Sequence, residues 1–398
     1  EKCLLQNGTY QCLCSPTCTD ETNCPNGTET VSNGCGGTCI VCKKGPPAEA
    51  VIFTFSPDIS NVTLTLPTAS YYGITADYTV DWGDGTIDKN LTTFSPTHTY
   101  AKAGSYDVTI TGSLGRLGRI SSSNIKYVTQ IKQLNLNSIR QFSSTFKNGT
   151  NITGTIPELP LNLEYAGDMF YECKNLTGRI PKFPPKLDYG GGMFFKCGGL
   201  TGNIPALPES LTNGDGMFTD CTGLTGNIPV LPKSLSSAGS RIGTTARASR
   251  EGMFGGCSGL TGNIPQLPER LREAHGMFKD CTGLTGSIPQ LPTALRYAKS
   301  MFDGCRNLTG NVPELPAGLT DGDMMFSGCH KLTGNIPQLP TGLINAYSMF
   351  EGCSGLTGNI PELPRSLVAV NVMFEGCRGL AGVTTVNGQY PYQYLINA

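Results

Sequence analysis

Cysteine is the residue type in this sequence whose number and spacing could do the most chemistry. The 398-residue chain contains 17 cysteines, which fall into two groups. The first group lies in a polar stretch at the start of the chain and comprises Cys3, Cys12, Cys14, Cys18, Cys24, Cys35, Cys39 and Cys42. Such a density is typical of a small domain held together by disulfides, here up to four, whose pairing the sequence does not reveal. The Cys39-x-x-Cys42 spacing also permits zinc, but no histidine lies nearby, so disulfides are favoured.

The second group of cysteines recurs every 24 residues, with one interval of 36. Its members are Cys173, Cys197, Cys221, Cys257, Cys281, Cys305, Cys329, Cys353 and Cys377. Their number is odd, and consecutive coils would place them about one strand spacing apart. A buried thiol behaves as a small apolar group, so we predict that this column packs in the core. A redox or metal ladder is the less favoured alternative.

Acidic residues could form one metal site, because Asp81, Asp84 and Asp88 are clustered and hard cations bind carboxylates. Their spacing is not that of a calcium loop, so we favour a turn formed by Asp84 and predict no metal and no cofactor. The three histidines (His98, His275 and His330) are scattered. The sequence also has no zinc-protease, nucleophile-elbow or phosphate-loop motif. We therefore predict that the protein is not an enzyme.

Two other features bear on binding. The 36-residue interval contains 12 extra residues near 238–249, with Arg241, Arg247 and Arg250 and no acid until Glu251. Insertions in repeat proteins often map to a binding face, so an anion-binding loop is one interpretation, although a loop without a function or one prone to proteolysis is favoured.

Eight Asn-x-Thr sequons predict N-glycosylation. Their asparagines are Asn7, Asn26, Asn61, Asn90, Asn148, Asn151, Asn175 and Asn307.

A 24-residue repeat must position most of these residues. Its unit reads M-F-x-x-C-x-x-L-T-G-x-I-P-x-L-P, as in residues 277–292. A degenerate copy of the unit begins with Thr145-Phe146. One unit cannot enclose its own apolar side chains, but stacked units can form a continuous core, which predicts a solenoid of about ten coils. Paired prolines forbid a long helix. We expect a short helical turn at Met-Phe and a short strand at Leu-Thr-Gly-x-Ile-Pro, with strands of neighbouring coils parallel and about 4.8 Å apart.

The M-F-x-x-C-x-x-L motif resembles the BspA-type leucine-rich repeat of microbial surface proteins. The Leu-Thr-Gly-x-Ile-Pro part also resembles the plant-type extracellular leucine-rich repeat. This resemblance implies a right-handed leucine-rich-repeat solenoid over residues 142–380. Because solenoids are scaffolds for many functions, the resemblance is more specific for the fold than for the function.

Alternating segments before the repeats predict a β-sandwich, at residues 51–55, 62–66, 78–82 and 106–110. Residues 80–86 (Val-Asp-Trp-Gly-Asp-Gly-Thr), followed by His98-Thr99-Tyr100 and by Tyr106, resemble the PKD immunoglobulin-like domain. The resemblance implies that Trp82 fills the core of this sandwich.

The sequence therefore predicts a mainly β chain of five parts. They are a disulfide-rich head (1–45), an immunoglobulin-like sandwich (46–113), a connector that caps the solenoid (114–141), the solenoid (142–380) and a terminal cap or donated strand (381–398). The alternating segment 128–136 is expected to cover the open end of the first coil.

Composition excludes some classes of function. The net charge is -1 and only 15% of residues are charged, so no electrostatic footprint for nucleic acid exists. No apolar run is long enough to span a membrane. A start at Glu1 suggests a mature, secreted or cell-surface protein after removal of a signal peptide. We expect a glycosylated structural subunit that assembles with copies of itself into a fibre or coat. The alternative is a monomeric adhesin or receptor-like module that binds host protein or glycan through the solenoid.

Overall fold

The computed structural model describes residues 47–239 and 252–381 in full, together with four strands in the first 46 residues. The chain divides into two compact units, Glu1–Ala48 and Glu49–Ala398. The first unit contains two antiparallel hairpins. One joins β1 (Leu4–Gln6) to β2 (Thr9–Gln11), and the other joins β3 (Thr28–Ser32) to β4 (Thr38–Cys42). The side chains of the eight cysteines lie outside the described residues, so their disulfides stay a prediction.

The second unit begins with a β-sandwich. One sheet has the strand order β13-β5-β11-β8-β9, and β6 pairs antiparallel with β10. The bounds are β5 (Val51–Phe55), β6 (Val62–Thr65), β8 (Asp77–Asp81), β9 (Ile87–Leu91), β10 (Thr97–Tyr100), β11 (Tyr106–Ser113) and β13 (Val128–Gln133). All five residues of β5 are buried, whereas β6 alternates between buried and exposed residues. The four strands expected from alternation are therefore confirmed.

The sandwich covers the first coil of the solenoid. Short strand β12 (Arg116–Leu117) pairs antiparallel with β7 (Thr68–Ala69) and parallel with β14 (Gln141–Phe142), which already belongs to the coils. After the 3-10 turn η2 (Ile125–Tyr127), β13 pairs antiparallel with β5, and its Gln130 forms a parallel bridge with Thr153. The ring of Phe53 in β5 meets the ring of Phe146 edge-on at 6.2 Å. The hydrophobic core thus runs without a break from the sandwich into the coils.

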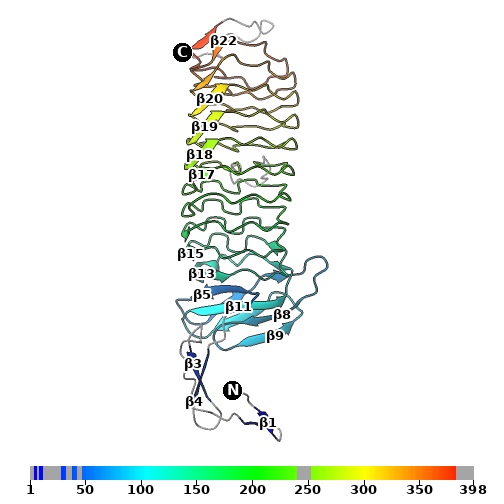
Figure 1. The fold of residues 1–398 in the computed structure, drawn as a ribbon, viewed down its shortest axis with the longest axis vertical. Coiled ribbons are helices and arrows are strands. Elements are labelled where there is room, and N and C mark those ends of the chain that lie inside the picture. The colour runs from blue at the N-terminus through cyan, green and yellow to red at the C-terminus, as the bar shows by residue number, and fades with distance from the viewer. Residues whose placement is uncertain are drawn as a thin grey trace. The chain divides into compact units, whose positions relative to one another are not determined.

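Above the sandwich, most coils contribute a short strand at or next to the Leu-Thr-Gly segment, and these segments pair in parallel along one side (Figure 1). The coil with Leu200 contributes isolated parallel bridges instead, from Gly178 to Leu200 and from Gly202 to Leu224. The strands are β15 (Gly154–Thr155), β16 (Leu176–Thr177), β17 (Gly226–Asn227), β18 (Leu260–Asn263), β19 (Leu284–Ser287), β20 (Leu308–Asn311), β21 (Leu332–Thr333), β22 (Thr357–Asn359) and β23 (Gly379–Ala381). The predicted strand position and its parallel pairing are confirmed.

The interior of the solenoid is built from columns of equivalent residues. Ten fully buried phenylalanines stack ring over ring, with centroids 5.4 to 5.8 Å apart and planes within 12° of parallel. They are Phe146, Phe170, Phe194, Phe218, Phe254, Phe278, Phe302, Phe326, Phe350 and Phe374. The mainly β class, the β-solenoid and the β-rich domain before it agree with the expectation from sequence.

The Met-Phe segment differs from the prediction, because it forms a run of turns and not a helical turn. Alternate N–H groups bond to the next coil, as Ser300 N does to Asp323 O at 2.7 Å and Phe302 N to Met325 O at 2.9 Å. Left-handed residues in this segment make that possible, for example Asp280 (φ 55) and Ser300 (φ 53). They rotate the peptide planes so that N–H groups point along the stack. A right-handed helix would direct these groups back along its own chain.

One left-handed position holds a residue poorly suited to it. Ser348 has φ 50, is 1% exposed, and its hydroxyl finds no hydrogen-bond partner among the described residues. Equivalent positions in other coils carry Gly192, Gly216 and Gly276. We expect Ser348→Gly to raise the free energy of unfolding by about 1–2 kcal/mol, because it removes both the backbone strain and the unsatisfied hydroxyl. Denaturant unfolding measures this change. Ser348→Ala keeps the strain and should gain less, and an unchanged or lower stability of Ser348→Gly would contradict the prediction.

Candidate functional site

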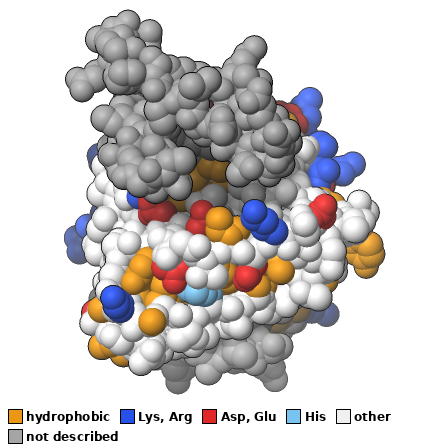
Figure 2. Space-filling model, turned by 90° about the horizontal axis from the view of Figure 1, so that it is seen from below, with side chains coloured by type: hydrophobic (Ala, Val, Ile, Leu, Met, Phe, Trp, Pro, Cys, Tyr) orange, Lys and Arg blue, Asp and Glu red, His pale blue; other side chains and the backbone are white. Residues whose placement is uncertain are grey.

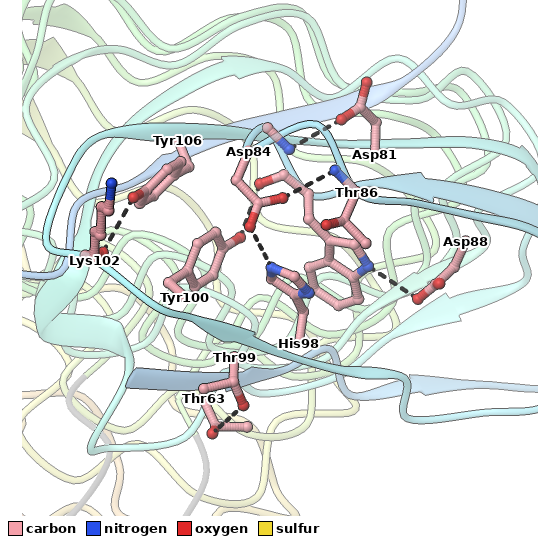
Figure 3. Close-up of polar contacts among 12 residues, drawn as sticks. Thr63, Asp81, Asp84, Thr86, Asp88, His98, Thr99, Tyr100, Lys102 and Tyr106 are labelled. Atoms are coloured by element: carbon pink, nitrogen blue, oxygen red, sulfur yellow. Dashed lines mark hydrogen bonds and ion pairs between the residues drawn. The ribbon is translucent and has the colours of Figure 1, made fainter. Parts of the chain in front are cut away.

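The polar cluster at one end of the sandwich is the first candidate, because it contains a histidine bonded to a carboxylate (Figure 3). His98 Nε2 lies 2.7 Å from Asp84 Oδ2. The imidazole ring stacks on the indole of Trp82 with centroids 5.1 Å apart, and it meets Tyr100 edge-on at 4.7 Å. The Tyr100 hydroxyl donates to the carbonyl oxygen of Trp82 at 3.0 Å. The imidazole is therefore held on three sides by the core of the sandwich.

The three carboxylates of this cluster stabilise the chain turn locally. Asp81 accepts the N–H of Gly83 at 2.9 Å, and Asp84 accepts the N–H of Thr86 at 3.0 Å. Asp88 accepts the indole N–H of Trp82 at 2.9 Å. The turn expected at Asp84 is thus present. Within residues 47–239 and 252–381, no three Asp, Glu, His or Cys side chains come together as a metal site would require.

The Asp84–His98 pair has two members of a catalytic triad but not its geometry. Among the hydrogen bonds of the described side chains, none joins the His98 ring to a serine, threonine or cysteine. One face of the ring stacks on Trp82, and Nε2 bonds to Asp84, so the imidazole connects strand β10 to the turn after β8. The face of the molecule in Figure 2 shows acidic, basic and hydrophobic side chains interspersed, without a block of one charge. The cluster is a structural feature of the sandwich.

The cluster predicts a loss of stability in acid. Burial raises the pKa of Asp84, but the hydrogen bonds from His98 and Thr86 outweigh it and leave that pKa below its usual value. A carboxylate with a depressed folded-state pKa stabilises the fold above the unfolded pKa of about 3.9, and this contribution disappears as the pH falls through the folded value. We expect unfolding followed by Trp82 fluorescence to show this loss below about pH 4. In Asp84→Asn, the free energy of unfolding should depend less on pH below about pH 4. An identical pH profile for variant and wild type would contradict the prediction.

The nine repeat cysteines form a second candidate, and the structure shows why they are cysteines. Each thiol donates to the carbonyl oxygen of the phenylalanine in the preceding coil, with S···O distances between 2.9 and 3.2 Å. Cys281 Sγ, for example, lies 3.0 Å from Phe254 O, and that oxygen also accepts the N–H of Cys257. The column therefore packs as predicted and in addition links each coil to the one before it.

These thiols are poor reactive groups. All nine are free and buried, and burial raises the pKa of Cys173 and of Cys257 to about 12. The thiolate is the nucleophile and the metal ligand, and here it is strongly disfavoured at neutral pH. Burial also shields these thiols from solvent, so they are protected from oxidants in solution.

The third candidate is a pocket of about 450 Å³ on the outside of the first coils. It is lined by Tyr71, Glu164, Tyr165, Pro185, Lys186, Asp188, Tyr189 and Ser210. Tyr71 comes from the sandwich, after β7, and its hydroxyl donates to Glu164 Oε2 at 2.8 Å. The rings of Tyr165 and Tyr189 occupy equivalent positions in neighbouring coils and stack with centroids 4.5 Å apart.

Glycines leave room for the hydroxyl ends of the two stacked tyrosines. A Cβ atom added at Gly167 would come within 2.5 Å of the Tyr165 hydroxyl oxygen, and one at Gly191 within 2.8 Å of that of Tyr189. Tyr-x-Gly occurs twice among the coils at this position, at 165–167 and 189–191. Sequence reasoning missed the pocket, although this paired motif was a visible signal. The contribution of Tyr71 could not be seen, because it comes from a distant part of the chain.

The other predicted site residues are spread over the molecule. Arg241, Arg247 and Arg250, together with Asn7 and Asn26, lie outside the described residues. Asn61 and Asn90 are exposed. The side-chain amides of Asn151, Asn175 and Asn307 donate to carbonyl oxygens of preceding segments at 2.6 to 2.8 Å.

The hydrogen bonds of Asn175 and Asn307 join neighbouring coils, and that of Asn151 joins the first coil to the turn η2. They give a structural reason for asparagine at those positions, so the number of sequons alone is a weak guide to glycosylation. Occupancy of every sequon, including Asn148, stays a prediction.

Comparison with known proteins adds the following. Residues 51–123 match the family described as PKD domain, and residues 275–385 match the family described as Mycoplasma protein of unknown function, DUF285. No curated protein matches the chain. Along the described part of the chain, no helix is both long and apolar enough to traverse a bilayer.

One solved structure with similarity is the crystal structure of the TLR13-ssRNA13 complex, at 11% identity and a TM-score of 0.22. The alignment covers 67% of this chain and 45% of that chain, so this protein spans less than half of it. That similarity is too low to carry an argument. The PKD-type sandwich followed by a β-solenoid is compatible with adhesive or structural roles.

Proposed function

We propose that the chain is a non-enzymatic, extracellular binding module of the adhesin type, whose coils are BspA-like leucine-rich repeats. One contrast carries the proposal. The buried column holds phenylalanine in all ten described coils. A second column, whose residues are joined from coil to coil by single parallel β-bridges, holds a different residue type in most coils. This second column runs Gln141, Tyr165, Tyr189, Asn213, Ser237, Glu273, Tyr297, Asp321, Asn345, Ala369. An invariant interior with a variable outer face is typical of a scaffold that presents a recognition surface.

The structure favours this function over a self-assembling fibre, which the sequence had favoured. A fibre built by end-to-end stacking needs coils that can continue into another copy. Here the first coil is covered by the sandwich, through the Phe53–Phe146 contact and through β12 and β13. Continuation from this end would expose both Phe53 and Phe146 to water. Assembly into a fibre or coat is therefore the competing proposal.

An extracellular location is part of the proposal. PKD domains occur in extracellular proteins, and the first 42 residues carry eight cysteines. Disulfides form and persist in oxidising compartments. The buried thiol column is compatible with the same compartment, because its sulfur atoms are inaccessible. N-glycosylation of exposed sequons such as Asn61 and Asn90 belongs to this proposal as well.

Two measurements on the purified full chain test the function. Sedimentation velocity and negative-stain electron microscopy should show isolated particles of one chain. Arrays of immobilised glycans and of extracellular-matrix proteins should show saturable binding. Filaments that form at micromolar concentration would favour the fibre and overturn the proposal. Isolated particles that bind nothing on either array would also overturn it.

A further inference from the structure

We propose that the pocket lined by Tyr71, Tyr165 and Tyr189 is a binding site for a neutral saccharide. This inference rests on the proposed binding function and adds to it a ligand class and a location. The pocket has about 450 Å³, which is within the range of small-ligand sites. Three of its eight lining residues are tyrosines, and they come from three segments that are separate in the sequence. Tyr165 and Tyr189 occupy equivalent positions in neighbouring coils, whereas Tyr71 comes from the sandwich, so the repeat alone does not form this pocket.

The tyrosines supply a rigid apolar surface with polar tips. Tyr165 and Tyr189 are half-buried, and their stacked rings are nearly parallel, with 6° between the ring planes. Gly167 and Gly191 leave the space in which their hydroxyl ends lie. Aromatic side chains of this kind offer large contact area with little conformational freedom to lose. A sugar presents C–H groups that can contact this surface and hydroxyl groups at its rim.

The polar lining suits hydroxyl groups better than it suits a charge. Glu164 and Asp188 are acceptors, while Lys186 is a donor and the tyrosine hydroxyls can be either. Glu164 already receives the Tyr71 hydroxyl at 2.8 Å and lies 3.7 Å from Arg140. Glu164 thus has a nearby basic partner, and Asp188 accepts the hydroxyl of Thr212. A ligand that both donates and accepts hydrogen bonds, and that carries no net charge, fits this balance.

A cationic ligand is the principal alternative, because cations bind over tyrosine faces. Two observations argue against it. Lys186 lines the pocket itself, and Arg140 neutralises Glu164. The faces that Tyr165 and Tyr189 turn toward each other are also occupied by their mutual stacking. A ligand can therefore contact the edges and outer faces of the two rings, next to hydroxyl and carboxylate groups.

The chain contains a matched control for the experiment. Tyr297 stands at the same coil position as Tyr189 and is bridged to its neighbours in the same way. Its nearest ring is that of His275, at 5.9 Å, and the residue two places on is Lys299 in place of a glycine. Tyr297 is also exposed and takes no part in the lining of the pocket. A substitution there removes a tyrosine from the same column without touching the proposed site.

The test is titration of the full chain by calorimetry with neutral oligosaccharides of glucose, galactose, mannose and N-acetylglucosamine. Sialylated oligosaccharides and choline serve as charged probes. We expect at least one neutral sugar to bind, and Tyr189→Ala to weaken that binding at least tenfold. Tyr297→Ala should leave it within twofold of wild type. Tyr189→Phe keeps the ring and should lose less, and Gly191→Ala should weaken binding because its Cβ displaces the Tyr189 hydroxyl.

The possible outcomes separate this inference from the proposed function. If glycan or matrix-protein binding persists unchanged in Tyr189→Ala, the site assignment is wrong while the binding function stands. If choline binds and no neutral sugar does, the ligand class is wrong. If no probe binds and the chain forms filaments, the proposed function itself fails. Thermal unfolding of each variant, matched to wild type, shows that a loss of binding is not a loss of fold.

Discussion

Replacing Phe278 with alanine is expected to lower the free energy of unfolding by about 3–5 kcal/mol. The side chain is completely buried, and its ring lies 5.8 Å from that of Phe254 and 5.7 Å from that of Phe302. Its removal leaves a cavity between two coils, where neighbouring side chains are held by the hydrogen bonds of their own coils. Because each coil is stabilised mainly by its neighbours, a defect at this position weakens two interfaces at once.

Chemical denaturation followed by circular dichroism measures this loss. Thr285→Ala is the matched control, because Thr285 lies in the same coil but is exposed on strand β19, so its effect should stay within about 0.5 kcal/mol. Equal effects of the two substitutions would show that the phenylalanine stack is not the source of stability. Fluorescence of the single tryptophan, Trp82, reports on the sandwich in the same experiment. Since one core connects the sandwich to the coils, both signals should change together.

The substitution Trp82→Ala is expected to lower the free energy of unfolding by about 3–5 kcal/mol as well. Trp82 is fully buried, and it holds the cluster in Figure 3 by three different contacts. Its ring stacks on His98, its N–H donates to Asp88, and its carbonyl oxygen accepts the Tyr100 hydroxyl. The first two contacts disappear with the side chain. The sandwich then loses both its largest core residue and the anchor of the turn after β8.

Trp82→Phe separates the two contributions. It keeps an aromatic ring against His98 but removes the N–H donor of Asp88, so its expected loss is smaller, about 1–3 kcal/mol. Circular dichroism is the appropriate signal, because both variants lack the tryptophan. A Trp82→Ala protein as stable as wild type would mean that the indole does not support the core. A Trp82→Phe protein as unstable as Trp82→Ala would place the whole effect in the hydrogen bond to Asp88.

Much of the solenoid could be predicted because its stabilising contacts are between equivalent residues. A 24-residue period places Phe278 over Phe254 and under Phe302 whatever the path of the chain between them, and the structure confirms this column. The strand at Leu-Thr-Gly and its parallel pairing follow from the same periodicity, as β19 and β20 show. Alternation of apolar and polar residues was likewise sufficient to find β5, β6, β8 and β11, because each packs one or both faces on a core.

Features that depend on backbone direction could not be predicted in this way. The left-handed conformations of Asp280 and Ser300 turn the Met-Phe segment away from a helix, and neither residue type demands a positive φ. The thiol of Cys281 donates to Phe254 O because those turns bring the two atoms within 3.0 Å. From composition alone a buried cysteine is only a small apolar residue.

The sequence by itself therefore determined the repeat, its buried columns and the mainly β class, since these depend on periodic burial of apolar side chains. The tertiary structure alone decided which groups from unrelated segments meet. It places Tyr71 beside Tyr165 and Tyr189, it covers Phe146 with Phe53, and it connects Asp84 to His98. Contacts of this kind join residues with no common period, so they exist only once the sandwich has folded and, for Tyr71 and Phe53, has packed on the first coil.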